Sequence, residues 1–237
     1  MRTRAARIAL LSVIPLGLLL VGYTVQPVTN GGTIQGSVRL AGAVPRLAPY
    51  PVTDPTQQGA CTRTVANEEL VVGAGGALAN AVVWIEGIRS GAAPRRTELT
   101  LDQQGCHYRP RVQAGVAGSQ VTVISSDATL HNVHARQGTR SVFNIAMPAK
   151  GMRVRRPLAR PGMIEVKCDA GHTWMHAWIH LFDHPYFAVT GADGRFQIPN
   201  VPPGTYTVKV WHERYPTQTR QLTVAASGAA TWDVSFR

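Results

Sequence analysis

The sequence is poor in acidic residues and in cysteine. Only 13 of its 237 residues are Asp or Glu against 24 Lys or Arg, so the formal net charge is +11 at pH 7. This charge favours an acidic partner or an anionic membrane surface. No nucleic-acid-binding motif and no basic segment interleaved with aromatic residues accompanies it, so we expect no binding to nucleic acid.

Common catalytic signatures are also missing. The chain has no Walker motif, no H-E-x-x-H pair and no nucleophile elbow. The run Gly73-Ala-Gly-Gly76 lacks the third spaced glycine of a dinucleotide-binding loop, and a strand-like segment at 81–86 follows it where a helix is needed. We expect a turn at 73–76 and no enzymatic activity.

Helical periodicity is lacking beyond the N-terminus. Short alternating segments bounded by Gly and Pro occur instead, which predicts an all-β chain built as a sandwich or barrel. Residues 43–58 are rich in proline and are expected to form a loop. We expect strands at Thr33–Leu40, Glu69–Val72, Ala81–Glu86, Gly118–Ser125, Met163–Cys168, Trp178–Phe182, Arg195–Ile198, Thr205–Trp211, Arg220–Val224 and Thr231–Phe236.

The N-terminus contains the one long apolar run. Arg2, Arg4 and Arg7 precede apolar residues 8–23, a pattern typical of an export signal. The run is near the lower length limit for a membrane span, and no A-x-A site follows it. Residues 1–25 are therefore either a cleaved signal peptide or an uncleaved membrane anchor. Both interpretations place the folded part in a periplasmic or other extracytoplasmic compartment, anchored to the inner membrane in the second case.

Three cysteines in an exported chain leave one without a partner. We expect a disulfide between Cys61 and Cys106 in an oxidising compartment. Cys168 then remains a free thiol. An unpaired thiol outside the cytoplasm needs a reason, and metal ligation supplies one.

The segment Cys168-Asp-Ala-Gly-His172-Thr-Trp-Met175-His176 brings a thiolate, an imidazole and a thioether close together in sequence. Soft sulfur combined with imidazole selects copper over hard cations. A blue-copper site needs two imidazoles and one thiolate near a plane, with a weak axial methionine. One loop can supply three of these ligands. The second histidine must come from elsewhere, and His131-Asn-Val-His134 offers it.

Two segments resemble the cupredoxins. Residues 113–133 form a Gly-led strand pattern that runs to an acidic turn at Asp127 and then to His-Asn-Val. Residues 161–168 resemble the strand that delivers the ligand cysteine in plastocyanin and amicyanin. The Cys-x3-His-x2-Met loop is one residue longer than the loop of amicyanin. This resemblance covers about residues 97–184 and implies a Greek-key cupredoxin sandwich.

The cupredoxin resemblance implies one mononuclear, type 1-like copper. Its ligands would be His131, Cys168, His172 and Met175, with His176 as the alternative axial ligand. Asn132 matches the asparagine that ties the two ligand loops together. Asp169 stands where the family often has Ser or Thr, and an acid there would lower the reduction potential. Other histidines are assigned no metal: His134 has an open role, His180 and His184 are non-ligands, and His107 and His212 are surface or interface residues.

A second resemblance lies at the C-terminus. Residues 190–210 contain an Asp-Gly hairpin, a Pro-Pro-Gly turn and a Tyr-bearing strand, similar to the carboxypeptidase-regulatory, transthyretin-like sandwich. This module is normally non-catalytic. We predict that residues 33–96 plus 185–237 form it as a split sandwich, with the copper domain, residues 97–184, inserted. The alternative is two adjacent sandwiches, with residues 33–87 in the copper domain.

The predicted function is one-electron transfer by an exported copper protein. Its partner would be a redox protein, for example an acidic cytochrome, and the N-terminal segment would allow membrane association. Two alternatives stay open at this point. One is a copper carrier or sensor without redox duty, and the other is a structural β-sandwich interaction module that uses Cys168 in another way.

Overall fold

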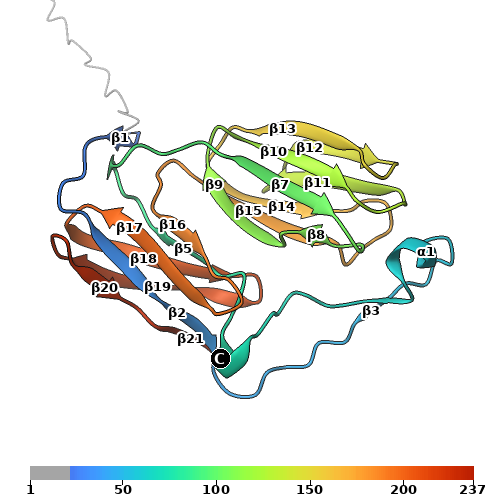
Figure 1. Cartoon of the computed structure of the whole chain (residues 1–237), viewed down its shortest axis with the longest axis horizontal. Helices are drawn as coiled ribbons and strands as arrows, with labels where there is room; N and C mark the ends of the chain where they lie inside the picture. Colours follow the sequence, from blue (N-terminus) through green and yellow to red (C-terminus); the bar gives the residue numbers. More distant parts are fainter. Residues whose placement is uncertain (1–21) are drawn as a thin grey trace, which may run out of the picture.

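The computed structural model describes residues 22–237, which are nearly all β, as predicted (Figure 1). Within this range the helical elements are the short α1 (Gln58–Cys61) and the single 3-10 turn η1 (Ala74–Gly76). No helix among the described residues is long and apolar enough to cross a membrane. Most of the expected signal or anchor segment, residues 1–25, lies outside the described residues. Its end, however, belongs to the folded body, because β1 (Thr24–Val25) pairs with β6 (Ser90–Gly91).

The first sandwich encloses its own apolar core between two sheets. One sheet has the order β13-β10-β7-β8: β7 (Glu98–Gln103), β8 (Tyr108–Arg109), β10 (Ser119–Ser125) and β13 (Arg153–Leu158). The other has the order β12-β11-β14-β15-β9: β9 (Val112–Val116), β11 (His131–Gln137), β12 (Arg140–Met147), β14 (Gly162–Lys167) and β15 (His176–Phe182). The parallel pairs β7–β10 and β9–β15 join strands that are distant in sequence. Alternate residues of each strand face the core between the sheets.

The second sandwich is built from both ends of the chain. Its sheets have the orders β16-β5-β18-β19 and β17-β2-β20, with β21 also on β2. The strands are β2 (Gly32–Leu40), β5 (Val82–Ile85), β16 (Phe187–Val189), β17 (Arg195–Val201), β18 (Gly204–His212), β19 (Tyr215–Val224), β20 (Ala229–Thr231) and β21 (Val234–Phe236). Gly36 is required on β2, because a Cβ there would lie 2.0 Å from the carbonyl oxygen of Trp232. The chain leaves the second sandwich after β5, forms the first sandwich, and returns to the second sandwich at β16.

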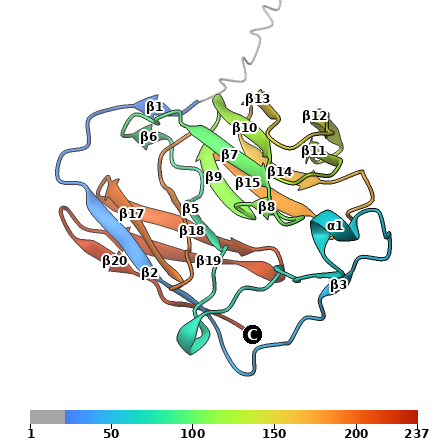
Figure 2. The same ribbon diagram turned by 45° about the vertical axis from the view of Figure 1, so that its right-hand side comes forward.

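Residues 50–65 depart from the expected division of the chain. The sequence pattern assigns them to the split sandwich with residues 33–96, but Val52, Cys61 and Val65 lie in the core of the first sandwich. Figure 2 shows this stretch, with β3 (Tyr50–Pro51), α1 and β4 (Thr64–Val65), beside the end of the first sandwich. A disulfide and apolar packing hold it there. The proline-rich connection after β2 is long enough to carry these residues to the first sandwich.

Several strands differ from the sequence expectations. The strands β7, β9, β11, β12 and β13 were not expected. The arginine-rich β13 shows why, because an exposed edge strand needs no apolar alternation. Glu69–Val72 is not a strand and makes only one bridge, between Val72 and Leu78. Side chains hold it instead, since the Glu69 carboxylate accepts hydrogen bonds from Tyr50 and Arg214.

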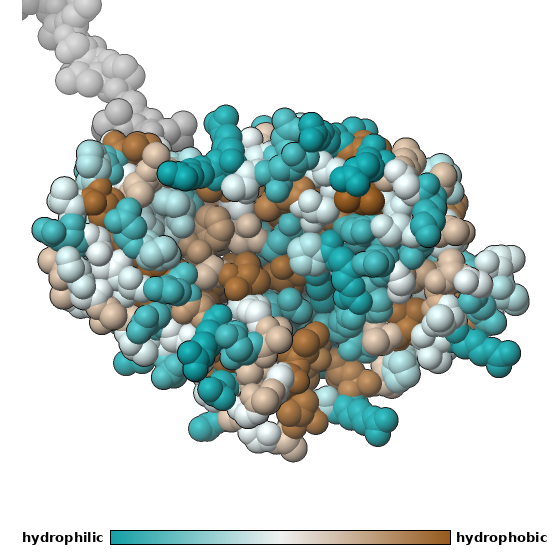
Figure 3. Space-filling model, viewed as in Figure 1, coloured by the Kyte–Doolittle hydropathy of each residue, from teal (hydrophilic) through white to brown (hydrophobic). Residues whose placement is uncertain are grey.

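The two sandwiches pack through aromatic side chains of β15, β5 and β18. The ring of His180 lies 4.5 Å from that of Trp211, and Trp178 lies 5.4 Å from the same ring. Beside them, Arg111 and Glu213 form a buried bidentate ion pair with bonds of 2.6 and 2.7 Å. Figure 3, in the view of Figure 1, shows apolar atoms at the surface in the middle of the molecule, with hydrophilic atoms on both sides of them. The ion pair and the aromatic contacts together fix how the two units meet.

His107 and His212 do not lie at the surface, which is one of the two places expected for them. Both are buried. His212 packs against Tyr215 and Phe236 inside the second sandwich, where β18 ends. His107 lies 3.4 Å from the Glu68 carboxylate.

Burial lowers the pKa of His180 and of His212 to about 4, against about 6.5 in an unfolded chain. The unfolded state therefore binds more protons between these values, so the free energy of unfolding falls as the pH drops from about 6.5 to about 4. We expect the calorimetric Tm to decline over this window. His180→Phe should flatten the decline, because it removes one imidazole that is buried in its neutral form. An identical pH slope for the variant and the parent would contradict this assignment.

Candidate metal centre

Three side chains predicted to bind metal converge at one end of the first sandwich. His131 begins β11, Cys168 follows β14, and His172 lies in the loop that leads to β15. His131 Nδ1 lies 3.3 Å from His172 Nδ1, and Cys168 Sγ lies 3.5 Å from the same nitrogen. The side chains are 0%, 7% and 1% exposed, respectively, for His131, Cys168 and His172. The antiparallel pairing of β11 with β14 brings the two ligand segments together.

The spacing of these atoms fits a single metal ion. Imidazole nitrogens bind such ions at about 2.0 Å and thiolate sulfur at about 2.3 Å, so near-tetrahedral angles separate the donors by ~3.3 Å for N–N and ~3.5 Å for N–S. The separations in the protein are 3.3 and 3.5 Å. One sulfur with two imidazoles suits a soft or borderline metal rather than calcium or magnesium.

Cys168 is poised to ionise. Burial raises the pKa of its thiol, but hydrogen bonds with His131 and His172 and with the backbone N–H groups of Ala170 and Asn132 outweigh burial and lower the pKa to about 6. The thiolate is the form that binds metals. The chain therefore presents its sulfur in the binding form at neutral pH.

Asn132 links the two ligand segments. Its backbone N–H donates to Cys168 Sγ (3.3 Å), and its Oδ1 accepts from the backbone N–H of Asp169 (3.3 Å). Its Nδ2 also donates to Asn144 Oδ1 (2.7 Å). Asn132 thus occupies the tying position that the sequence assigned to it.

Asp169 and His134 form a pair on the outer side of the site. The exposed Asp169 carboxylate lies 2.8 Å from His134 Nδ1. His134 is three positions after His131 along β11, so the two rings are on opposite faces of the strand. The role left open for His134 is therefore a partnership with Asp169, which places a hydrogen-bonding imidazole beside that acid.

The two candidate axial ligands lie in different surroundings. Met175 is buried in the same apolar core as Cys168, and its backbone N–H donates to the carbonyl of His172 (2.9 Å), which folds the loop back. His176 begins β15 and alternates with the core-facing Ala177, so it shares the outer face with Trp178. Burial, followed by the charge of Lys167, lowers the pKa of His176. Only Met175 of the two shares the core that contains Cys168.

Asp127 contacts His131, a role that the sequence motifs do not assign to it. Its Oδ2 lies 2.9 Å from His131 Nε2, on the side of the ring away from Cys168 and His172. Burial raises the pKa of Asp127, but hydrogen bonds from His131 and from the backbone of Cys106 and Gly105 lower it overall. The signal was its place in the acidic turn four residues before His131.

The predicted disulfide between Cys61 and Cys106 is confirmed, and Cys168 is free and buried. The closeness of this disulfide to His172 was not expected from the sequence. Both of its sulfurs lie within 4.8 Å of a ring nitrogen of His172. Cys61 ends α1, so the disulfide fastens the 50–65 segment over this end of the sandwich. The cover leaves His172 without access to solvent.

Trp174 completes the surroundings of His172. Its ring meets the imidazole edge-on, with ring centres 5.4 Å apart. Its Nε1 donates to the carbonyl oxygen of Cys106 (3.0 Å), and its ring also stacks on Tyr50 of the covering segment. The aromatic ring and the disulfide thus confine His172 together.

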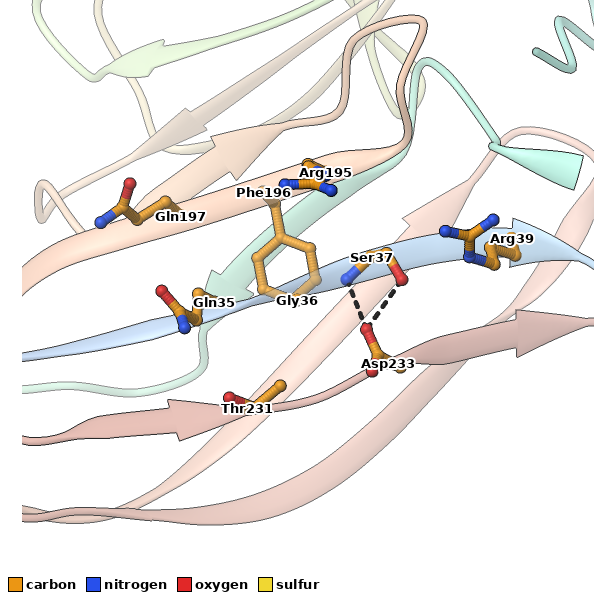
Figure 4. Close-up of a pocket in the computed structure, with 9 residues that line it drawn as sticks. All are labelled: Gln35, Gly36, Ser37, Arg39, Arg195, Phe196, Gln197, Thr231 and Asp233. Atoms are coloured by element: carbon orange, nitrogen blue, oxygen red, sulfur yellow. Dashed lines mark hydrogen bonds between the residues drawn. The ribbon is translucent and has the colours of Figure 1, made fainter. Parts of the chain in front are cut away.

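A hollow lies away from this centre, on the second sandwich (Figure 4). It has a volume of about 570 Å³. Asp233 Oδ1 there accepts hydrogen bonds from the backbone N–H and the hydroxyl of Ser37, at 2.9 and 2.7 Å. Most of the residues that line it are polar, for example Arg39 and Gln197, and none of them is histidine or cysteine. The hollow therefore lacks the donors of a soft-metal site.

Sequence comparison supports the C-terminal resemblance. The family model described as Carboxypeptidase regulatory-like domain matches residues 169–237, which include β15 to β21. Rhamnogalacturonate lyase A of Emericella nidulans is 33% identical over 67 residues, which are 28% of this chain and 12% of that protein. The chain thus spans about an eighth of the length of this curated relative.

Several solved copper proteins are similar to part of the chain. The copper-containing nitrite reductase of Thermus scotoductus SA-01 is 18% identical with a TM-score of 0.33, over 39% of this chain and 24% of that one. A purple cupredoxin of Nitrosopumilus maritimus is 17% identical with a TM-score of 0.31, over 35% of this chain and 99% of that one. A reduced amicyanin mutant is 18% identical with a TM-score of 0.33, over 42% of this chain and 98% of that one.

Thiol counting tests the cysteine assignment. The denatured, unreduced protein should contain one reactive thiol. Replacing Cys61 and Cys106 together by Ser should lower the free energy of unfolding by about 2–5 kcal/mol, because the cross-link no longer restricts the unfolded chain. Cys168→Ser, which removes no covalent bond, is the matched control. Three reactive thiols, or a bridged peptide that contains Cys168, would overturn the pairing.

Proposed function

We propose that this protein binds one copper ion through His131, Cys168 and His172 and transfers single electrons. The observation that carries the proposal is the convergence of two imidazole nitrogens and one low-pKa thiol at 3.3–3.5 Å inside an apolar core. Two imidazoles and a thiolate with a weak axial thioether form the donor set of blue-copper centres. We assign Met175 to the axial position because it shares the core of Cys168.

Copper bound to these ligands would supply a one-electron Cu(II)/Cu(I) couple. The protein's part is to hold the donors still. His131 is held by Asp127, Cys168 by the N–H of Asn132, and His172 by Trp174 and the disulfide. Donors fixed from outside keep similar positions in both oxidation states, which favours fast electron exchange with a partner.

Electron transfer is favoured over catalysis and over copper carriage. Four protein ligands in a buried site leave no open coordination position for a substrate. A carrier must load and release its metal, whereas the covering segment here is fastened by a disulfide beside His172. We therefore propose a non-enzymatic electron-transfer protein rather than a copper carrier or a purely structural module.

The proposed setting is extracytoplasmic. It is supported by the basic-then-apolar N-terminal pattern and by the confirmed disulfide. The net charge of +11 suits an acidic redox protein, such as an acidic cytochrome, as partner. Salt would then slow the association of the two proteins, because it screens their attraction.

The visible spectrum of the copper-loaded protein tests the proposal. Cu(II) should give an intense blue thiolate-to-metal band, with one copper bound per chain. Cys168→Ser should abolish the band while the protein stays folded, since serine cannot supply the sulfur. A colourless protein that binds only Cu(I) would favour carriage instead. Failure to bind copper would leave the structural alternative.

The axial ligand can be tested with two neighbouring variants. Met175→Leu should keep the blue colour and raise the reduction potential, because a thioether donor that stabilises Cu(II) is lost. His176→Ala is the control and should leave the spectrum and potential nearly unchanged. A strong spectral shift in His176→Ala with no change in Met175→Leu would indicate a centre of three imidazoles and one thiolate.

A further inference from the structure

Asp127 contacts the outer nitrogen of one proposed ligand. The distance from its Oδ2 to His131 Nε2 is 2.9 Å, and its side chain is 10% exposed. The other ring nitrogen, Nδ1, faces His172 and Cys168. A carboxylate can only accept a hydrogen bond, so His131 Nε2 must carry the proton in this contact. When a metal replaces the proton shared with Cys168, Nδ1 of the then neutral ring offers its lone pair on the side of the metal donors.

The backbone of the next loop fixes this carboxylate. Its Oδ1 accepts from the N–H of Gly105 and its Oδ2 from the N–H of Cys106, both at 2.8 Å. Cys106 is itself bonded to Cys61. Asp127 is therefore held by two main-chain donors and, through them, by a covalent cross-link.

The same loop reaches the second histidine. The carbonyl oxygen of Cys106 accepts from Trp174 Nε1, and that ring stands edge-on to His172. Cys106 thus connects the outer surroundings of both imidazoles, through its N–H and Asp127 to His131 and through its carbonyl and Trp174 to His172. A change in this loop would therefore alter the surroundings of both His131 and His172.

We propose that Asp127 is the positioning residue of the metal centre. It selects the ring form of His131 whose Nδ1 can bind metal, and its negative charge makes that imidazole a stronger donor. The Gly105–Cys106 backbone holds it in place. This inference rests on the proposed copper function and adds to it a residue that sets metal affinity and reduction potential without touching the metal.

The first test compares Asp127→Asn with Asp102→Asn. The amide introduced by Asp127→Asn is nearly isosteric, but it has no charge and only one acceptor oxygen for three donors. Asp102 is a control in the same sandwich whose carboxylate accepts instead from the Ser126 hydroxyl. Loss of an outer carboxylate partner typically weakens metal affinity 10- to 100-fold. We expect Asp127→Asn to weaken Cu(II) binding in this range and Cu(I) binding less, and Asp102→Asn to change neither.

The reduction potential should follow from these affinities. If the affinity for Cu(II) falls tenfold more than the affinity for Cu(I), the reduction potential rises by about 59 mV. A purely structural role for Asp127 would lower the Tm but leave the ratio of the two affinities unchanged. Equal potentials in Asp127→Asn and Asp102→Asn, with copper still bound, would therefore overturn the proposal.

A second measurement needs no variant and covers the case in which Asp127→Asn fails to fold. Nitrogen-15 NMR of the diamagnetic Cu(I) protein reports which nitrogen of His131 carries the proton. We expect a slowly exchanging Nε2–H at low field, as for a proton shared with a carboxylate. Protonation at Nδ1 would overturn the role of Asp127. A parent protein that binds no copper would instead reject the proposed function, so the two failures are distinguishable.

Discussion

The stabilisation of one buried thiolate is the interaction on which this structure depends. An uncompensated charge in an apolar core is costly, so burial alone would keep Cys168 protonated. Two imidazoles and the backbone N–H groups of Asn132 and Ala170 reverse this preference and lower the pKa to about 6. The register of β11 against β14 brings these groups together, so a feature of the fold has a direct chemical consequence. A metal cation is the natural counterpart of such a cluster.

The second requirement is protection of the cluster from water. The first sandwich alone leaves one end to be covered, and the chain covers it with residues 50–65, which come from the long connection within the second sandwich. The Cys61–Cys106 disulfide fastens this cover beside His172, while Cys106 also anchors Asp127 and Trp174. The inserted arrangement of the two sandwiches thus contributes directly to the site, since the host chain supplies its cover.

The segments proposed to bind the metal could be picked out from sequence because their chemistry is concentrated in short motifs. Cys168 and His172 are four residues apart, and His131 stands next to a recognisable asparagine. Asp127 and the covering segment could not be assigned in this way. The role of Asp127 depends on a contact with Gly105 and Cys106, which are about twenty residues away. The disulfide of Cys61 was predicted, but its role in covering the site depends on how residues 50–65 fold back over the first sandwich. Edge strands such as β13 were missed for a different reason, because they lack an apolar face.

Anomalous diffraction from crystals of the copper-loaded protein tests the proposed copper site most directly. Data collected on either side of the copper absorption edge should give one strong peak per chain, surrounded by His131 Nδ1, His172 Nδ1 and Cys168 Sγ, with the Met175 sulfur on the axial side. His131 Nε2 should remain hydrogen-bonded to the Asp127 carboxylate. A copper peak elsewhere, or one bound without Cys168, would contradict the assignment of this cluster as the metal centre.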